Sequence, residues 1–236
     1  MAAPPRDDVP QGLPQGAEKR AAVRAMFDAI APRYDLVNRV MTLRMDVGWR
    51  RTAIRRMELP PRAVVADLAC GTGDFCAELA AAGHHPVGID LSVGMLAAAR
   101  TAAPLAQGDL LALPLAAASV DAAVCGFALR NLVDLPPFFA ELHRVVRPGG
   151  RVALLDVSEP SNRLLRRGHR LYFNKVVPRI GGLLSSRSAY EYLPRSVSYL
   201  PPPAEMISML GAAGLTGATR TQLSTGIAQL LVATRP

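Results

Sequence analysis

The sequence predicts an α/β fold in which helices cover both faces of a doubly wound, mostly parallel sheet. Short apolar runs alternate with helical patterns over residues 64–157, as in consecutive βαβ units. One of these units has a glycine-rich loop between its strand and its helix. Two further apolar runs, 216–222 and 227–234, surround Ser224-Thr225-Gly226 and predict a C-terminal antiparallel hairpin. The expected sheet is therefore parallel in its first part and antiparallel at its C-terminal edge.

The N-terminal part of the chain precedes the first predicted strand and is extra to this sheet. Residues 1–17 are rich in Pro, Gly and Gln and predict a flexible tail. Residues 18–58 have a helical pattern that Pro32 interrupts, and a second helix is expected over Met45–Met57. The apolar residues at helical spacing are Met26, Phe27, Ile30 and Tyr34. We expect this region to form an N-terminal helical lid, with helices packed on the core as appendages as the alternative.

Residues 62–157 form the expected ligand-binding core. Its strands are expected at Val64–Leu68, 86–90, Leu105–Gln107, 119–127 and 151–157. Its helices are expected from Phe75 to near Gly83, from the N-cap Ser92 to about Arg100, and from Asp134 through Val145. Pro148-Gly149-Gly150 predicts a tight turn. Residues 158–203 interrupt the alternation as an insert, and residues 204–236 should form a helix over 204–213 followed by the hairpin.

Composition limits the classes of protein that fit. The chain has 236 residues, half of them hydrophobic, which suffices for a single α/β domain with additions. No apolar run approaches the roughly 20 residues of a membrane-spanning helix, and the N-terminus lacks a secretion-signal pattern. We therefore expect a cytoplasmic protein. Three cysteines without metal-ligand spacing, Cys70, Cys76 and Cys125, predict reduced thiols and no metal site.

The net charge of +8 comes mainly from arginine. It permits contact with nucleic acid or an anionic membrane, but a compositional bias toward Ala, Arg and Pro explains it equally well. The sequence has neither a basic stripe interleaved with aromatics nor an Asn-Pro-Pro-Tyr type motif for a flipped base. We expect no nucleic-acid partner.

The glycine-rich loop reads Asp67-x-Ala69-x-Gly71-x-Gly73 and directly follows an apolar strand. Glycines let the backbone turn sharply and approach a ligand, which would lie at the carboxyl end of the strand. A dinucleotide fingerprint needs a third glycine where this chain has Cys76, so that fingerprint is not met. Asp90 ends the next strand about 20 residues further on, where a carboxylate can accept hydrogen bonds from ribose hydroxyls. The motif resembles the first motif of class I S-adenosylmethionine-dependent methyltransferases.

Longer segments extend the resemblance over most of the chain. They are Met-Phe-Asp-Ala-Ile-Ala-Pro-Arg-Tyr-Asp at 26–35, Gly-Phe-Ala-Leu-Arg-Asn at 126–131, the Arg-Pro-Gly-Gly-Arg and Leu-Asp-Val-Ser-Glu-Pro runs within 144–160, Pro-Arg-Ile-Gly at 178–181, and Tyr-Leu-Pro-Arg-Ser-Val at 192–197. With these segments the chain resembles the demethylmenaquinone and ubiquinone C-methyltransferases of quinone biosynthesis. That resemblance implies a Rossmann-like seven-stranded sheet and methyl transfer from S-adenosyl-L-methionine to a ring carbon of a lipid-soluble polyprenyl quinol.

The resemblance also implies site residues. The expected cofactor contacts are Asp67, Ala69, Gly71, Thr72, Gly73, Asp90, Leu91, Gly108, Asp109 and Gly126. Arg130 and Asn131, with Tyr34, are expected on the acceptor side. The chain departs from the family pattern at Ala128, where glycine is usual, at Gly126, where serine is common, and in lacking a histidine near its C-terminal end. The acceptor ring therefore stays open: demethylmenaquinol, a ubiquinone-type benzoquinol, or another aromatic metabolite methylated on carbon or oxygen.

The chemistry of ring methylation suits these residues. A ring carbon is a weak nucleophile until a hydroxyl on the ring loses its proton, so the enzyme must position the reactants and favour the phenolate. Arg130, always cationic, can stabilise that charge or position a water that takes the proton, and Asn131 can hold a ring oxygen. Alternatively, Arg130 caps a helix end or pairs with Asp134. A non-catalytic cofactor-binding protein is a further alternative, which the intact loop acids and glycines disfavour.

The insert mixes cations with apolar side chains. It holds Arg163, Arg166, Arg167, Arg170 and Lys175 among Leu164, Leu165, Leu171, Tyr172, Phe173 and Val176. Such a mixture suits a segment that contacts anionic headgroups at the inner face of the cell membrane. Packing of the apolar residues on the core, with solvated arginines outside, fits the sequence as well. The oligomeric state stays open, with a homodimer as one alternative.

Overall fold

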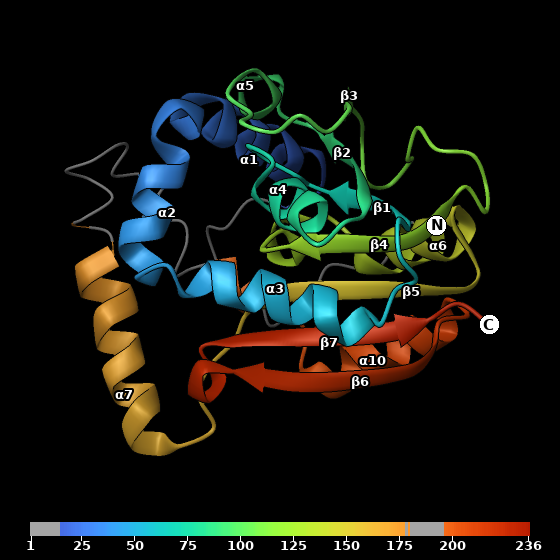
Figure 1. Ribbon diagram of the computed structural model, residues 1–236. Coiled ribbons are helices and arrows are strands. Elements are labelled where there is room, and N and C mark those ends of the chain that lie inside the picture. The colour runs from blue at the N-terminus through green and yellow to red at the C-terminus, as the bar shows by residue number, and fades with distance from the viewer. Residues whose placement is uncertain (1–14, 178, 180–195) are drawn as a thin grey trace.

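In the computed structural model, which describes residues 15–177, 179 and 196–236, the chain forms a seven-stranded sheet in the order β3-β2-β1-β4-β5-β7-β6 (Figure 1). Its strands are β1 (Val64–Leu68), β2 (His85–Asp90), β3 (Leu105–Gln107), β4 (Val120–Gly126), β5 (Val146–Val157), β6 (Thr216–Leu223) and β7 (Ala228–Thr234). Strands β1 to β5 are parallel, whereas β7 runs antiparallel to both β5 and β6. The predicted α/β fold with its antiparallel C-terminal hairpin is confirmed.

The helices follow the predicted alternation closely. They are α1 (Gly16–Ile30), α2 (Tyr34–Thr42), α3 (Met45–Met57), α4 (Asp74–Ala81), α5 (Val93–Ala97), α6 (Leu135–Val145), α7 (Arg163–Leu171) and α10 (Pro203–Ala212), with short helical turns η1 (Ala31–Arg33), η2 (Leu129–Asn131), η3 (Tyr172–Val176), η4 (Val197–Tyr199) and η5 (Ser224–Gly226). No helix in this part of the chain is long and apolar enough to cross a membrane. The expected tail up to residue 14, most of the 178–181 and 192–197 segments, and the Phe173 side chain lie outside the described residues.

The sheet separates two apolar layers because successive strand residues point to opposite faces. Alternate residues such as Leu68, Cys125 and Leu154 pack with α6 and α10 on one face. The intervening residues, such as Val65 and Val124, pack with α3 and α4 on the other. The runs are apolar on both faces, as expected of parallel strands covered by helices. Consequently α3 packs in the core through Trp49, Ala53, Ile54 and Met57, as one of the two alternatives for the N-terminal helices predicts.

Most predicted boundaries lie within one or two residues of those in the structure, but two differ by more. Pro148-Gly149-Gly150 is an irregular part of β5 rather than a tight turn, because Gly149, at φ +77°, donates to the Arg235 carbonyl over 2.7 Å and the Arg235 amide donates to Gly150 over 2.9 Å. Helix α5 ends at Ala97 rather than near Arg100, whose amide bonds the Thr72 carbonyl at 2.9 Å instead of continuing the helix.

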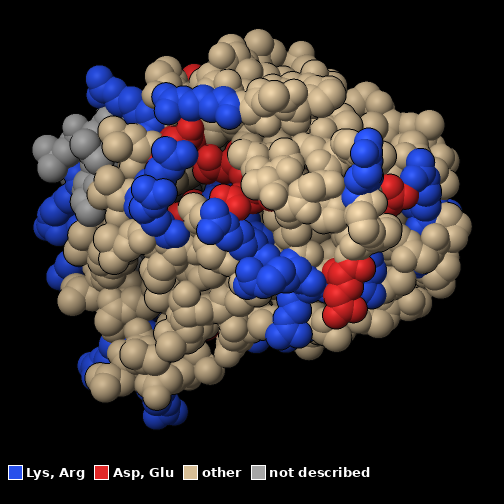
Figure 2. Space-filling view, viewed as in Figure 1, with Lys and Arg blue, Asp and Glu red and all other residues tan. Residues whose placement is uncertain are grey.

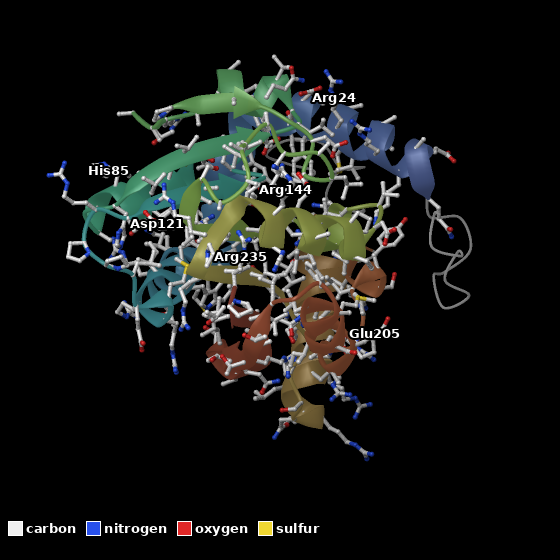
Figure 3. The ribbon with its side chains drawn as sticks, turned by 90° about the vertical axis from the view of Figure 1, so that its right-hand side faces the viewer. Arg24, His85, Asp121, Arg144, Glu205 and Arg235 are labelled. Carbon is white, nitrogen blue, oxygen red and sulfur yellow. The ribbon has the colours of Figure 1, made fainter. Side chains whose placement is uncertain are left out.

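The amino and carboxyl ends of the parallel strands differ in what they contain. At the amino end, Asp121 at the start of β4 accepts from the Val64 amide at 2.7 Å and pairs with Arg147, which fixes the starts of β1, β4 and β5 (Figure 3). At the carboxyl end, α1 and α2 cover the loops after β1 and β2 (Figure 1). The residues with ligand-binding chemistry therefore gather at the carboxyl end.

Candidate functional site

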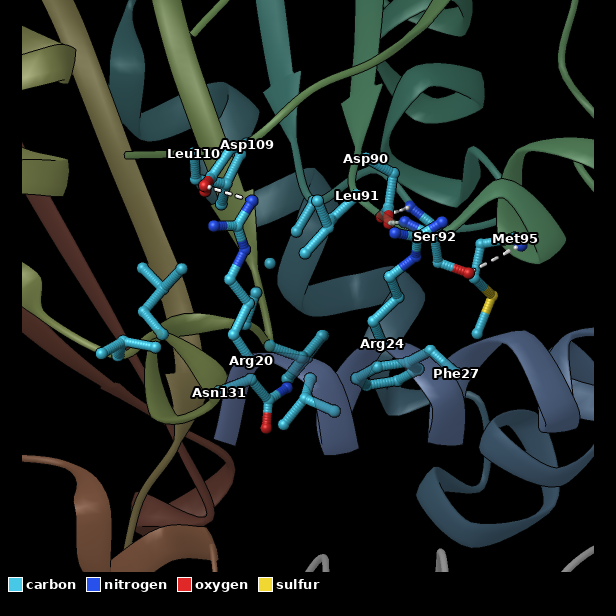
Figure 4. A pocket seen from close by; sticks show the side chains of 18 of the residues that line it. Arg20, Arg24, Phe27, Asp90, Leu91, Ser92, Met95, Asp109, Leu110 and Asn131 are labelled. Carbon is cyan, nitrogen blue, oxygen red and sulfur yellow. Dashed lines mark hydrogen bonds and ion pairs between the residues drawn. The ribbon is translucent and has the colours of Figure 1, made fainter. Parts of the chain in front are cut away.

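Two neighbouring cavities lie at the carboxyl end of the sheet. The first cavity is bounded by α1 and by the loops after β1, β2, β3 and β4 (Figure 4). The second cavity lies between α2, α3, η2 and the α7–η3 segment. Three residues line both cavities: Phe27, Tyr34 and Phe127. These side chains form a shared wall, so two ligands can approach each other there.

Six of the predicted cofactor contacts line the first cavity: Ala69, Gly71, Asp90, Leu91, Asp109 and Gly126. Asp90 connects the loops, because one carboxylate oxygen accepts from the Gly71 amide and the other from the Ser92 amide, both over 2.8 Å. Burial raises the pKa of Asp90, and these backbone amides counteract part of that rise. Each carboxylate oxygen has a second lone pair, so Asp90 can also accept from a hydroxyl in the cavity.

The other four predicted contacts do not line either cavity. Thr72 donates to Asp35 of α2 over 2.5 Å, and a Cβ on Gly73 would lie 2.5 Å from Thr101. A Cβ on Gly108 would lie 2.7 Å from the Pro114 ring. Asp67 is buried beneath the loop. These positions contact other parts of the protein, and their expected contact with the cofactor stays a prediction.

Asp67 fixes the start of α4. Its Oδ2 accepts from the Cys76 amide at 3.1 Å and from the Cys76 thiol at 3.2 Å. Burial raises the pKa of Asp67 to about 7, although the bonds from Cys76 and the charge of Arg50 lower it. The buried thiols are poor acids for the same reason: burial raises the pKa of Cys70, Cys76 and Cys125.

Helix α1 is fastened across the mouth of the first cavity. Arg20 pairs with Asp109 at 2.8 Å, and Lys19 donates to the Leu132 carbonyl at 2.6 Å (Figure 4). At the other end of α1, Asp28 accepts from the Ser92 hydroxyl at 2.6 Å and from the Gly94 amide at 2.9 Å. Gly94 allows this approach, because a Cβ there would lie 2.9 Å from the Asp28 backbone.

Asn131 provides a polar atom that lacks a partner in the described structure. Its side-chain Oδ1 is buried and accepts no hydrogen bond. The residue lines the first cavity and not the second, although the sequence places it on the acceptor side. A buried acceptor without a donor costs stability, so a donor on a bound ligand would remove that cost.

Phe127 is a site residue that the sequence does not single out. Its backbone is left-handed at φ +61°, which is rare for a bulky residue and costs on the order of 1–3 kcal/mol. Its amide donates to the Leu155 carbonyl at 2.6 Å, and its ring packs against Trp49 at 6.0 Å and over the Arg50 guanidinium at 5.7 Å. The strained backbone holds the ring between the two cavities.

Arg130 lines the second cavity and is held rigidly. Its Nη1 pairs with the buried Asp156 and donates to the Phe127 carbonyl at 2.7 Å, while Nε donates to the Ser196 hydroxyl at 3.2 Å. The partner is thus Asp156 rather than Asp134. Because Arg130 donates to the Phe127 carbonyl, it also holds Phe127 in the wall between the cavities.

Tyr34 and the α2–α3 charges complete the second cavity. Burial raises the pKa of Tyr34, although a hydrogen bond with Asn38 and the charge of Arg130 lower it in part. The phenol therefore stays protonated near neutral pH. Arg50 pairs with Asp46 at 2.6 Å and with Asp74 at 3.4 Å, and Thr42 donates to Asp46 at 2.7 Å. These charges compensate one another.

The α7–η3 segment closes the remaining side of the second cavity with His169 and Tyr172. The Tyr172 hydroxyl donates to the Met41 carbonyl of α2 at 2.8 Å. Burial lowers the pKa of His169, and the neighbouring Glu159 raises it in part. The described residues contain no group of three or more His, Cys, Asp or Glu side chains arranged to hold a metal ion.

Comparison with known proteins gives one family. The model of the ubiE/COQ5 methyltransferase family matches residues 15–235. A demethylmenaquinone methyltransferase of Deinococcus radiodurans is 44% identical over 226 residues, covering 91% of this chain and 93% of that protein. The ubiquinone/menaquinone biosynthesis C-methyltransferase UbiE of Syntrophotalea carbinolica is 40% identical over 216 residues, covering 88% and 91%.

Solved structures share the fold at low identity. A putative methyltransferase of Haloferax volcanii in complex with the Trm112 activator superposes with a TM-score of 0.66 at 18% identity, covering 89% of this chain and 97% of that one. A phosphoethanolamine N-methyltransferase of Haemonchus contortus in complex with S-adenosyl-L-methionine gives a TM-score of 0.59 at 15% identity, covering 79% and 52%. The family match over nearly the whole chain and the close relatives agree: this chain belongs to the ubiE/COQ5 methyltransferase family.

Proposed function

We propose that this protein methylates a ring carbon of a polyprenyl quinol, with S-adenosyl-L-methionine as the methyl donor and demethylmenaquinol as the acceptor. The observation that carries the proposal is the pair of cavities that meet at Phe127 and Tyr34. Transfer between two ligands needs such a junction, because the reacting atoms must approach closely in a fixed orientation. The names of the relatives supply the acceptor class.

The first cavity fits the cofactor. Asp90 would accept from ribose hydroxyls, and Asp109 and the unpartnered Asn131 oxygen would accept from amino groups. The left-handed backbone at Ala69 and Gly71 brings the loop to the edge of the cavity. Once bound there, S-adenosylmethionine supplies an electrophilic methyl group.

The second cavity fits the acceptor. Its apolar lining suits an aromatic ring and the first part of a prenyl chain: Met26, Ile30, Met41, Met45, Trp49, Val177 and Ile227. Arg130 would stabilise negative charge on a ring oxygen, and Tyr34 would donate a hydrogen bond to one. Asp156 holds Arg130 in place for this role.

The test is transfer of a labelled methyl group from S-adenosylmethionine to chemically reduced demethylmenaquinone, followed by location of the label. We expect one methyl on the free ring carbon, next to the prenyl chain. A label on oxygen, or turnover only with a benzoquinol or another aromatic in the same assay panel, would overturn the choice of acceptor.

We also propose that the protein works at the cytoplasmic face of the membrane, where such an acceptor resides. Helix α7 projects from the body of the protein at the lower left of Figure 1. Figure 2, in the same view, shows Lys and Arg side chains along this left-hand side. Leu164 is 78% exposed and Leu171 56%, while Leu43, which directly follows α2, is 75% exposed. Exposed leucines among cations are what an interfacial segment needs.

Arg163 and Arg167 of α7 allow a test of membrane contact. Arg166 and Arg170 make local bonds to Pro160, Ser161 and Glu159. Arg163 and Arg167 are exposed and bind none of these three residues. We expect Arg163→Glu with Arg167→Glu to reduce co-sedimentation with anionic liposomes, since each cation near such a surface contributes about 1 kcal/mol.

The matched control reverses two exposed arginines on α3, Arg55→Glu with Arg56→Glu, and changes net charge equally. Turnover of a long-chain quinol should fall only in the α7 variant, and a short, water-soluble quinol should react equally in both. Equal loss of sedimentation in the two variants would show that net charge alone matters and would contradict the proposal.

A further inference from the structure

The second cavity is lined by a histidine side chain, whose imidazole can accept a proton. A quinol hydroxyl must lose its proton before the ring carbon attacks, so a base must reach it. His169 comes from α7 and lines the same cavity as Tyr34, Phe127 and Arg130. We propose that His169 is the general base that removes the acceptor's hydroxyl proton; this inference rests on the proposed function.

The other ionisable side chains lining this cavity are poor candidates. Arg50 and Arg130 are cations held in ion pairs. Asp46 forms a buried ion pair with Arg50, and a proton taken up by its carboxylate would leave that cation without its partner. Burial raises the pKa of Tyr34 and of Tyr172, so both remain phenols near neutral pH.

The surroundings of His169 keep its imidazole in the basic form. Burial lowers its pKa below the ordinary value of 6.5, the charge of Arg170 lowers it further, and Glu159 opposes both. Glu159 is itself bound by Arg170 at 2.9–3.0 Å, which limits its effect. The half-buried position of His169 on the wall of the cavity thus keeps its imidazole neutral, the form that can accept a proton.

The proton balance of the step is complete. The hydroxyl proton passes to the imidazole, and the ring carbon forms its bond to the methyl group as the methyl–sulfur bond breaks and sulfur keeps the electron pair. The ring then loses its C–H proton, and a proton returns to the oxygen, which restores the aromatic quinol. One proton leaves to solvent in each turnover.

Tyr172 places His169 at the cavity. Tyr172 lies three residues after His169, at the start of η3, and its hydroxyl donates a hydrogen bond to the Met41 carbonyl. This bond joins the α7–η3 segment to α2. The same segment carries the exposed leucines that we assign to the membrane surface. Docking at a membrane would therefore occur beside the base.

The test compares His169→Gln with His85→Gln, a matched histidine at the exposed start of β2 (Figure 3). In single turnovers at limiting demethylmenaquinol, where the pH dependence reports the free enzyme, the wild-type rate should fall as the pH drops through the pKa of His169. His169→Gln should lower the rate about 100-fold or more and abolish this acid limb. Added imidazole should restore rate to His169→Gln, and His85→Gln should behave as wild type.

A second measurement does not depend on activity. Proton NMR of the His169 ring should give a pKa below 6.5 that coincides with the midpoint of the acid limb. An acid limb that persists in His169→Gln, or an NMR midpoint that differs from the kinetic one, would overturn the assignment. If wild-type protein fails to methylate demethylmenaquinol at all, the proposed function fails, whatever the NMR midpoint.

Discussion

The two cavities share a wall but use their charged groups in opposite ways. In the first cavity, the carboxylates of Asp90 and Asp109 face the cavity, and their partners are backbone amides and the lid residue Arg20. In the second cavity, the charges are paired with one another, as in Arg130–Asp156 and Arg50–Asp46. The first arrangement is suited to binding a polar ligand, and the second to holding a shape around an apolar one.

This difference has a consequence for mutations. Removing a charge from the first cavity should mainly change ligand affinity, because the lost partner is the ligand. Removing a charge from the second should first change stability, because a buried partner is left uncompensated.

Arg130→Ala should lower the free energy of unfolding by about 3–5 kcal/mol, because it leaves the Asp156 carboxylate buried without its cation. Urea unfolding measures this effect. The double variant with Asp156→Asn should recover part of the loss, since the uncompensated charge is then gone. A loss in Arg130→Ala no larger than that of an exposed arginine would contradict the structural role.

Arg130→Lys separates the charge of Arg130 from its geometry. It keeps the positive charge and loses the planar guanidinium that binds Asp156, Phe127 and Ser196 together. We expect nearly unchanged affinity for S-adenosylmethionine and a strong loss of turnover. Calorimetry and the methyl-transfer assay separate the two effects. Wild-type rates in this variant would remove Arg130 from the mechanism.

Asp90→Ala should weaken binding of S-adenosylmethionine by about 1–3 kcal/mol, because ribose hydroxyls lose a charged acceptor. It also removes the acceptor for the Gly71 and Ser92 amides, so Asp90→Asn is the matched control that keeps one acceptor oxygen. Calorimetry should show the highest affinity for the wild type, a lower one for Asp90→Asn and the lowest for Asp90→Ala. Equal affinity in all three would place the cofactor elsewhere.

Asp67 should make stability depend on pH. Its pKa of about 7 in the folded protein lies above its unfolded value near 3.9. Between these values the native state holds a proton that the unfolded state lacks, so stability should fall as pH rises, by at most about 1.4 kcal/mol per pH unit. Urea unfolding from pH 4 to 7 should give a shallower slope for Asp67→Asn. Parallel slopes would show that Asp67 is ionised throughout.

Arg20→Ala should have the smallest effect on stability, at most about 1 kcal/mol, because its ion pair with Asp109 is half exposed. It should nevertheless speed release of the cofactor, since that pair fastens α1 across the first cavity. Stopped-flow fluorescence of a bound cofactor analogue measures the rate. An unchanged release rate would show that α1 is not a lid.

The first cavity could be largely predicted from the sequence. Parallel strands bring their carboxyl ends to one edge, so Gly71, Asp90 and Asp109 had to lie near one another once the strands were recognised. The pattern does not say which loop residue faces the ligand. Thr72 and Gly73 line neither cavity, because Thr72 donates to Asp35 in α2 and Gly73 lies against Thr101, contacts that local sequence does not encode.

The second cavity could not be predicted in the same way, because tertiary packing builds it. The bond between Tyr172 and Met41 joins residues 131 positions apart, and the bond between Trp49 and Ser224 joins residues 175 apart. The partner of Arg130 likewise comes from the end of β5 rather than from nearby Asp134. No strand or glycine motif points to His169, whose position depends on where α7 packs.

The most direct test of the two-cavity account is a crystal structure with S-adenosylhomocysteine and a short-chain demethylmenaquinol bound together. We expect the ribose at Asp90, the cofactor sulfur at the wall formed by Phe127 and Tyr34, and the quinol ring beyond that wall, beside Arg130 and His169. A quinol ring in the first cavity, or one whose free carbon points away from the sulfur, would contradict it.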